Sequence, residues 1–110
     1  MPRPRKQRIL SDRLRPAVYK PAGVALDDLR RVVLLYEELE ALRLADLEGL
    51  SQAQGAQHMG VSRSTFQRIV SRARRQVALA LSEGQALQVE PAPSDVRPPR
   101  PRRARRRGAP

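Results

Sequence analysis

The side chains of this chain best suited to chemistry are arginines on a stretch that has no acidic neighbours. No Asp or Glu lies between Glu48 and Glu83, whereas five arginines do: Arg63, Arg68, Arg72, Arg74 and Arg75. A guanidinium presents two parallel N–H donors, which match phosphate oxygens and the major-groove edge of guanine. A helix that only packs and stays soluble normally mixes both charge signs on its outer face. The pattern therefore favours contact with a nucleic acid.

Position along the predicted helix divides these side chains and their neighbours into two kinds of DNA contact. The first turns are expected to face base edges, where a good bidentate pair discriminates by ~1–3 kcal/mol. The base-contacting set is Arg63, Ser64, Gln67 and Arg68. Phosphate contacts, which position a protein without specifying sequence, are expected from Ser62, Thr65, Arg72, Arg74 and Arg75. The alternatives are a capping role for the two hydroxyls and a solvated helix face for the three arginines.

These side chains need two helices joined by a sharp turn, and residues 52–71 carry that pattern. Gly60 stands where the chain must turn and accepts a positive φ, and Ser62 follows it as an N-cap. The apolar positions that close the angle between the helices are Ala56, Met59, Val61, Phe66 and Ile69. The predicted helices cover 52–59 and 63–82. This spacing is typical of a DNA-reading helix-turn-helix, although helices joined by glycine also occur in α-folds that never contact nucleic acid.

Charge and proline divide the chain into a central domain and two basic arms. The formal net charge is +11; residues 1–20 and 91–110 contribute +6 each, and residues 21–90 contribute −1. All ten prolines lie outside the stretch between residues 21 and 91. Entry of the N-terminal arm into a minor groove is expected to use Arg3, Arg5 and Lys6. The C-terminal tail is expected to be disordered, and it either enters a minor groove as well, raises affinity by counterion release, or serves solubility alone.

The central domain is predicted to be mainly α-helical, with a three-helix core of the helix-turn-helix class and one or two short flanking strands. A further helix is predicted over 37–46, with its inward face formed by Leu39, Leu42 and Leu44. The runs 31–35 and 85–90 are predicted strands that pair with each other, within one chain or between two copies. Gly55 either admits a close neighbour or is merely tolerated. A core of about 70 residues buries a modest share of its surface, which favours a homodimer.

Several function classes lack the residues that they need. The chain has no cysteine, which excludes disulfides, thiolate metal sites and cysteine nucleophiles. His58 is the only histidine and has no ligand cluster around it, so we expect no metal and no cofactor. No nucleophile or phosphate loop accompanies the paired carboxylates, so the chain is not expected to be an enzyme.

Location and regulation are constrained in the same way. No apolar run approaches the ~20 residues of a membrane span, so we expect no membrane contact and a cytoplasmic, nucleoid-associated protein. No segment of the sequence resembles a ligand pocket. Any signal is therefore expected to arrive through a partner.

Three strings in the sequence are long or unusual: YKPAG at 19–23, EELEALRLADLEGLSQ at 37–52 and MGVSRSTF at 59–66. Through them residues 1–90 resemble a prokaryotic family catalogued as uncharacterised protein family 0251, small proteins with a predicted DNA-binding helix-turn-helix. Residues 51–81 are also similar to promoter-reading region 4 of sigma factors. The resemblance implies DNA binding and transcriptional regulation, without a known target. Two positions depart from the family: Gln7 replaces a common cysteine, and Leu35 replaces a capping threonine, so the helix that follows is expected to fray at its start.

The leading hypothesis is a sequence-specific transcriptional regulator that binds double-stranded DNA and reads the major groove with helix 63–82. A second hypothesis is a sigma-like module that docks on RNA polymerase through the acidic surface of 37–46. A third is RNA binding through the basic arms. The scarcity of aromatic residues argues against it, because single-stranded RNA is usually gripped by stacking. The aromatic residues are Tyr19, Tyr36 and Phe66.

Overall fold

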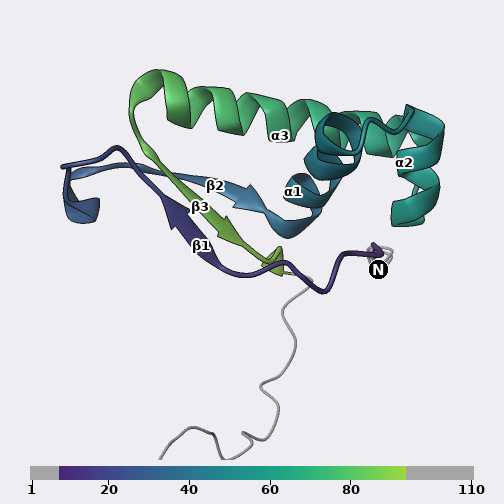
Figure 1. The fold of residues 1–110 in the computed structure, drawn as a ribbon, viewed down its shortest axis with the longest axis horizontal. Helices are drawn as coiled ribbons and strands as arrows, with labels where there is room; N and C mark the ends of the chain where they lie inside the picture. Colours follow the sequence, from purple (N-terminus) through teal and green to yellow (C-terminus); the bar gives the residue numbers. More distant parts are fainter. Residues whose placement is uncertain (1–7, 94–110) are drawn as a thin grey trace, which may run out of the picture.

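A computed structural model describes residues 8–93, in which helices outweigh strands and a small sheet lies beside three α-helices. In chain order the elements are β1 (Ala17–Tyr19), the 3-10 turn η1 (Leu26–Asp28), β2 (Arg31–Leu35), α1 (Tyr36–Leu42), the π-helical turn η2 (Arg43–Leu47), α2 (Gln52–Met59), α3 (Arg63–Glu83) and β3 (Ala86–Glu90). The long helix α3 runs over the sheet, and α1 and α2 gather around its N-terminal half (Figure 1). Residues 1–7 and 94–110, with the predicted arm residues Arg3, Arg5 and Lys6, lie outside the described part of the chain.

The sheet has the strand order β1-β3-β2, with β3 in the centre. β2 and β3 run parallel, with Arg31 opposite Ala86 and Leu35 opposite Glu90. The helices between them supply the long crossover that a parallel pair requires. The predicted pairing of the two runs is therefore confirmed, within a single chain. β1 adds antiparallel to the other side of β3 and was not foreseen, because it has only three residues.

The core forms where α3 meets the other two helices and the sheet. One cluster of buried side chains joins the three helices: Ala41, Leu44, Ala56, Met59, Phe66, Ile69 and Val70. A second cluster lies between α3 and the sheet: Leu34, Ala73 and Val89. In the first cluster a Cβ at Gly55 would lie 2.7 Å from two ring carbons of Phe66. Gly55 is thus present because the aromatic ring lies directly against the backbone of α2.

The helix predicted over 37–46 is found as α1 and η2, and its start is held despite the missing cap. Leu35 has no side-chain acceptor, but its backbone N–H donates to Oε1 of Glu38 at 2.8 Å. A carboxylate that reaches back from the first turn satisfies one of the free donors of a helix start. The predicted fraying is therefore not supported by the structure. Leu44 is buried, whereas Leu39 and Leu42 are half-buried against the second cluster.

The N-terminal segment is more ordered than its composition indicates. We predicted residues 1–20 to be an arm, but from residue 8 onward the chain lies against the domain. The backbone N–H of Ile9 donates to the carbonyl of Met59 at 3.1 Å, and Leu10 packs on the first core cluster. The average composition concealed these two apolar side chains among arginines and prolines. The folded unit therefore begins before the boundary that we placed at residue 20.

Candidate nucleic-acid interface

The turn between α2 and α3 has the geometry that the sequence predicts for it. Gly60 adopts φ +68°, and its N–H bonds to carbonyls in the last turn of α2. Ser51 caps α2, accepting the N–H of Gln54 at 3.1 Å, while Gln54 returns a side-chain acceptor to Ser51. α3 begins after Ser62 and ends at Gly84, which has φ +63°. Caps therefore define the ends of both helices, and the buried side chains of the first core cluster pack the helices against each other.

A short polar network covers the first turn of α3. The hydroxyl of Ser62 accepts the backbone N–H of Thr65 at 3.1 Å, which confirms its predicted capping role. The same hydroxyl donates to Oγ1 of Thr65 at 2.9 Å, and Arg68 Nη2 donates to that Oγ1 at 3.2 Å. The network therefore places one N–H of the Arg68 guanidinium against Thr65 and leaves its other donors exposed.

The outward face of the first two turns carries the predicted base-contacting set. Arg63, Ser64, Gln67 and Arg68 are all exposed. Phe66 and Ile69, on the opposite face, are buried in the core. In the described part of the chain, Arg63 and Gln67 make no side-chain hydrogen bond or ion pair, so their donors point at solvent. The face is cationic and has no acidic side chain.

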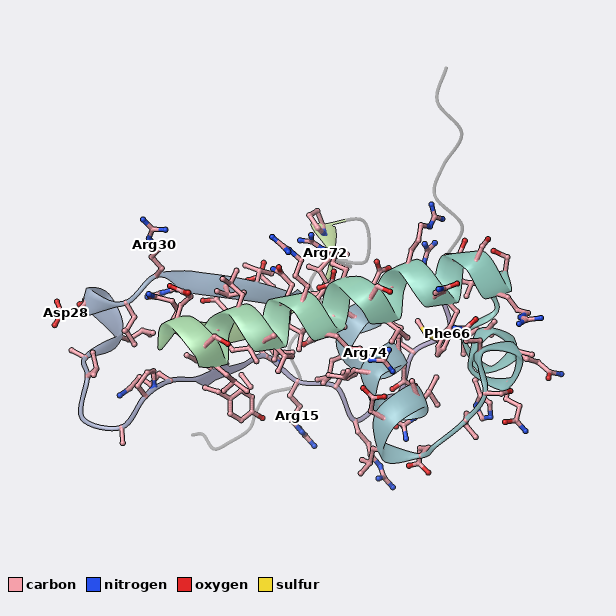
Figure 2. All side chains as sticks on the ribbon, turned by 90° about the horizontal axis from the view of Figure 1, so that it is seen from above. Arg15, Asp28, Arg30, Phe66, Arg72 and Arg74 are labelled. Carbon is pink, nitrogen blue, oxygen red and sulfur yellow. The ribbon has the colours of Figure 1, made fainter. Side chains whose placement is uncertain are left out.

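Two of the predicted phosphate ligands hold carboxylates of the same chain. Arg72 pairs with Glu38 at 2.6 Å, and Arg74 binds Asp46 through two N–H···O bonds of 2.7 and 3.1 Å. Both arginines lie along the middle of α3, beyond Phe66 (Figure 2). The hydrogen bond from Arg74 holds the pKa of Asp46 below its usual value. These two arginines fasten α1 and η2 to α3, and more than half of each side chain is still exposed.

Arg75 differs from its neighbours because it is exposed and has no partner among residues 8–93. Of the five predicted phosphate ligands, it alone keeps an unengaged charge in the described part of the chain. The hydroxyls of Ser62 and Thr65 are engaged in the cap. Four of the predicted phosphate ligands therefore make contacts within the described part of the chain, and only Arg75 there has an unpaired charge.

Comparison with known proteins places the chain in a family without an assigned function. Residues 1–94 match the family model described as "Protein of unknown function DUF134". A UPF0251 protein of Rhodospirillum rubrum is 52% identical over 93 residues, which cover 84% of this chain and 65% of that protein. The chain belongs to the UPF0251 family. A UPF0251 protein of Vibrio parahaemolyticus is 53% identical over 87 residues, which cover 79% of this chain and 91% of that relative.

No solved structure matches this UPF0251 chain. Among residues 8–93, no helix is long and apolar enough to cross a membrane. The same residues hold no group of three or more His, Asp or Glu arranged to bind a metal ion. His58 lies on the exposed side of α2. The candidate interface of this UPF0251 protein is therefore defined by the exposed side chains of α3 described above.

Two polar residues near the interface were missed by the sequence reasoning. A hollow of about 150 Å³ between α2 and α3 has Gln52 and Ser71 in its wall, beside Gln67 and Arg74. Ser71 lies four residues after Gln67, so helical periodicity alone would have placed it on the same face. Gln52 has no such signal, because its position depends on the angle between the two helices.

Proposed function

We propose that this protein is a transcriptional regulator that binds double-stranded DNA and reads the major groove with α3. The observation that carries the proposal is the exposed cationic face over the first turns of α3, with Arg63 and Gln67 unengaged. Such a helix, held against a second helix by a tight turn, has the size and chemistry to enter the groove. The proposal is one of binding, without a catalytic step, and places the protein on the nucleoid in the cytoplasm.

Each polar residue of the face has a separate role in this proposal. Arg63 and Gln67 bind base edges, and Arg68, braced by Thr65, presents its remaining donors beside them. A side chain fixed before binding loses less conformational entropy when the complex forms. Arg75 binds a phosphate and sets the register of the protein on the duplex. The basic residues outside the described range add affinity through counterion release.

RNA polymerase docking is less favoured, because the acidic surface that it needs is occupied within the chain. Only 9% of Glu37, 1% of Glu38 and 5% of Glu40 is exposed. These carboxylates pair with arginines: Arg8 with Glu37, Arg72 with Glu38, and Arg43 with Glu40. A partner protein would therefore find few free carboxylates on α1.

RNA binding by stacking is also less favoured by the structure. Phe66 is buried and Tyr36 is half-buried, so neither residue is freely exposed to solvent. Tyr19 is 63% exposed, but it lies on β1, away from the cationic face of α3. Successive bases need several aromatic platforms close together. Duplex DNA, which is read through its edges, suits this surface better.

We also propose a homodimer, but pairing of β3 between two copies does not support it. β3, one of the two predicted strands, has a neighbour on both sides and therefore no free edge for a second copy. The open edge of β2 is partly blocked, since Gln76 Nε2 donates to the carbonyl of Val33 and Glu38 accepts the N–H of Leu35. Such side chains suppress pairing with another strand. Any dimer would therefore use a surface other than β2.

Selection of bound duplexes from a random library tests the proposed function. The full chain and residues 8–93 should enrich the same motif at near-physiological salt, because α3 is present in both. The double variant Arg63→Ala with Gln67→Ala should lose the enrichment, whereas Arg30→Ala with Gln57→Ala, a control of equal charge change, should keep it. Arg30 lies at the far end of α3 from Phe66 (Figure 2). Binding without any enriched motif in either chain would contradict sequence-specific readout.

A further inference from the structure

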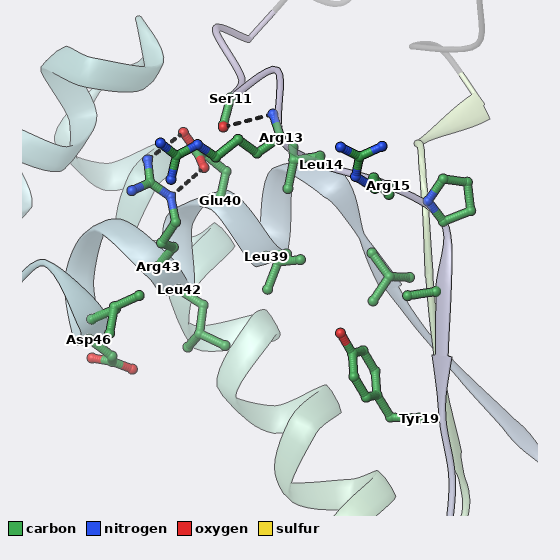
Figure 3. A pocket seen from close by; sticks show the side chains of 14 residues that line it. Ser11, Arg13, Leu14, Arg15, Tyr19, Leu39, Glu40, Leu42, Arg43 and Asp46 are labelled. Atoms are coloured by element: carbon green, nitrogen blue, oxygen red, sulfur yellow. Dashed lines mark hydrogen bonds and ion pairs between the residues drawn. The ribbon is translucent and has the colours of Figure 1, made fainter.

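A groove of about 670 Å³ lies between the N-terminal segment with β1 and the helical turns α1 and η2 (Figure 3). It is on a different part of the molecule from the cationic face of α3. Its walls come from three separate stretches of chain, 11–19, 39–47 and residue 89. No ligand pocket was predicted from the sequence, because no single stretch of the chain contains the residues of this groove.

The floor of the groove is apolar. Leu39 and Leu42 project from α1 toward Tyr19, which faces them from β1 (Figure 3). Two of the lining side chains are strongly exposed, Leu47 at 77% and Tyr19 at 63%. Exposed apolar side chains that line one hollow indicate a surface that binds a ligand or a partner. The volume lies within the usual range of small-molecule sites, about 300–1,000 Å³.

The mouth of the groove carries an excess of positive charge. Arg13 and Arg15 line it, and neither guanidinium has a hydrogen bond or ion pair within residues 8–93. The other charged lining groups are neutralised in pairs: Arg43 with Glu40 and Glu48, and Asp46 with Arg74. Two arginines without an ion pair in the described part of the chain therefore line the groove, with Arg13 near Glu40 and Arg43, and Arg15 on the other side (Figure 3).

We propose that the groove binds an amphipathic anion, a small molecule with a hydrocarbon or ring body and one carboxylate or phosphate group. The body packs against Leu39 and Leu42, and the anionic group accepts hydrogen bonds from Arg13 or from Arg15, whose guanidinium groups lie at separate places along the groove (Figure 3). Guanidinium groups bind carboxylates and phosphates through charge-assisted, often bidentate hydrogen bonds. An apolar body would cover the leucines of the groove, and one negative charge would pair with an arginine that has no partner in the described part of the chain.

A second copy of the chain fits the groove less well than a small anion. In a two-fold contact the same patch meets itself, so the arginines at the mouth of one copy would approach those of the other. Like charges brought together in this way cost free energy unless an anion separates them. A free anion removes that repulsion and needs no partner protein.

NMR titration of the isotope-labelled full chain tests the proposal, with octanoate, octyl phosphate and 1-octanol as probes. We expect saturable shifts at Leu39, Leu42 and Val89 with at least one of the two anions. That anion should bind about tenfold more tightly than 1-octanol, which has the same hydrocarbon body without the charge. A preference between the two anions identifies the head group. Equal affinity for the alcohol and both anions, or shifts spread over α3, would overturn the proposal.

Paired charge variants supply the control. Arg13→Gln with Arg15→Gln should weaken the anion about tenfold and leave 1-octanol unchanged. Arg30→Gln with Arg31→Gln removes the same charge away from the groove and should change neither affinity. An equal loss in both double variants would mean attraction by overall charge and would sink the site. The same spectra report folding, so a loss caused by unfolding is recognised directly. A dimer that shields the groove from all three probes would also refute it.

Discussion

Arg72 and Glu38 form an ion pair of 2.6 Å that connects the middle of α3 to the first turn of α1. The carboxylate also accepts the backbone N–H of Leu35, so one side chain holds the end of β2, the start of α1 and the body of α3. The side chain of Glu38 is almost fully buried, whereas the side chain of Arg72 is 59% exposed. The two partners therefore respond differently to loss of the other.

This asymmetry predicts that Arg72→Met destabilises the fold more than Glu38→Gln. The first change leaves a buried carboxylate without its cation, with an expected cost of about 3 kcal/mol. The second keeps an acceptor for Leu35 and leaves an arginine that water can reach, with an expected cost of about 1 kcal/mol. Urea unfolding of both variants measures the difference, and equal losses would contradict it.

Gly55→Ala should destabilise the protein, although alanine is the better helix former by about 1 kcal/mol. The added Cβ would overlap the ring of Phe66, and we expect a net loss of about 1–3 kcal/mol. Thermal unfolding measures it, with Gln57→Ala on the exposed side of α2 as the control. Combining Gly55→Ala with Phe66→Leu should recover part of the loss, because the smaller side chain can move away. An increase in Tm for Gly55→Ala alone would disprove the close-packing explanation.

The pair between Asp46 and Arg74 should make stability depend on acid pH. The hydrogen bond from Arg74 lowers the pKa of Asp46 in the folded state. A depressed pKa contributes stability above the unfolded value of ~3.9, and this contribution is lost as the pH falls through the folded value. Asp46→Asn should therefore lower stability slightly at pH 7 and hardly at all at the acid end. Urea unfolding at both pH values tests the sign; a gap that widens in acid would be inconsistent with it.

On a selected duplex, Arg63→Ala and Arg75→Ala should weaken DNA binding in different ways. Arg63→Ala should cost about 1–3 kcal/mol and relax the preference at one base position. Arg75→Ala should weaken all sequences alike and reduce the salt slope by about one. Fluorescence anisotropy over a series of salt concentrations and single-base variants separates the two effects. If both substitutions reduce affinity uniformly, Arg63 binds a phosphate rather than a base.

Deleting residues 91–110 should flatten the salt dependence of DNA binding. This segment contains seven arginines and one aspartate, and each phosphate neutralised by a protein cation contributes about 0.9 to the slope on B-DNA. The base preference should be unchanged, because α3 is intact. An unaltered slope would mean that the tail does not contact the duplex and serves solubility alone.

The sequence predicts the local elements of this fold well and their assembly less completely. Periodicity and caps place α2, the turn at Gly60 and α3, because these depend on neighbours a few residues away. Pairing of the two longer strands was also predicted. Strand order and the position of β1 were not, since they depend on contacts across most of the chain length.

The same distinction applies to the candidate site. The exposure of Arg63 and Gln67 follows from helical spacing alone. The partners of Arg72 and Arg74 could not be read from α3, because they lie on α1 and η2. Counting charges along α3 therefore does not reveal that two of its arginines are paired with carboxylates of the same chain. The apolar groove was missed for a similar reason, as its walls are distant in sequence.

The segment that precedes β1 contacts two regions of the molecule at once. Ile9 is bonded to the last residue of α2, and a few residues later the same segment forms a wall of the groove, from Ser11 to Tyr19. Occupancy of the groove and the setting of α2 against α3 therefore share one stretch of backbone. If α3 binds DNA and the groove binds an anion, the effect of each ligand on the affinity for the other must be the same factor, because binding free energies are linked reciprocally.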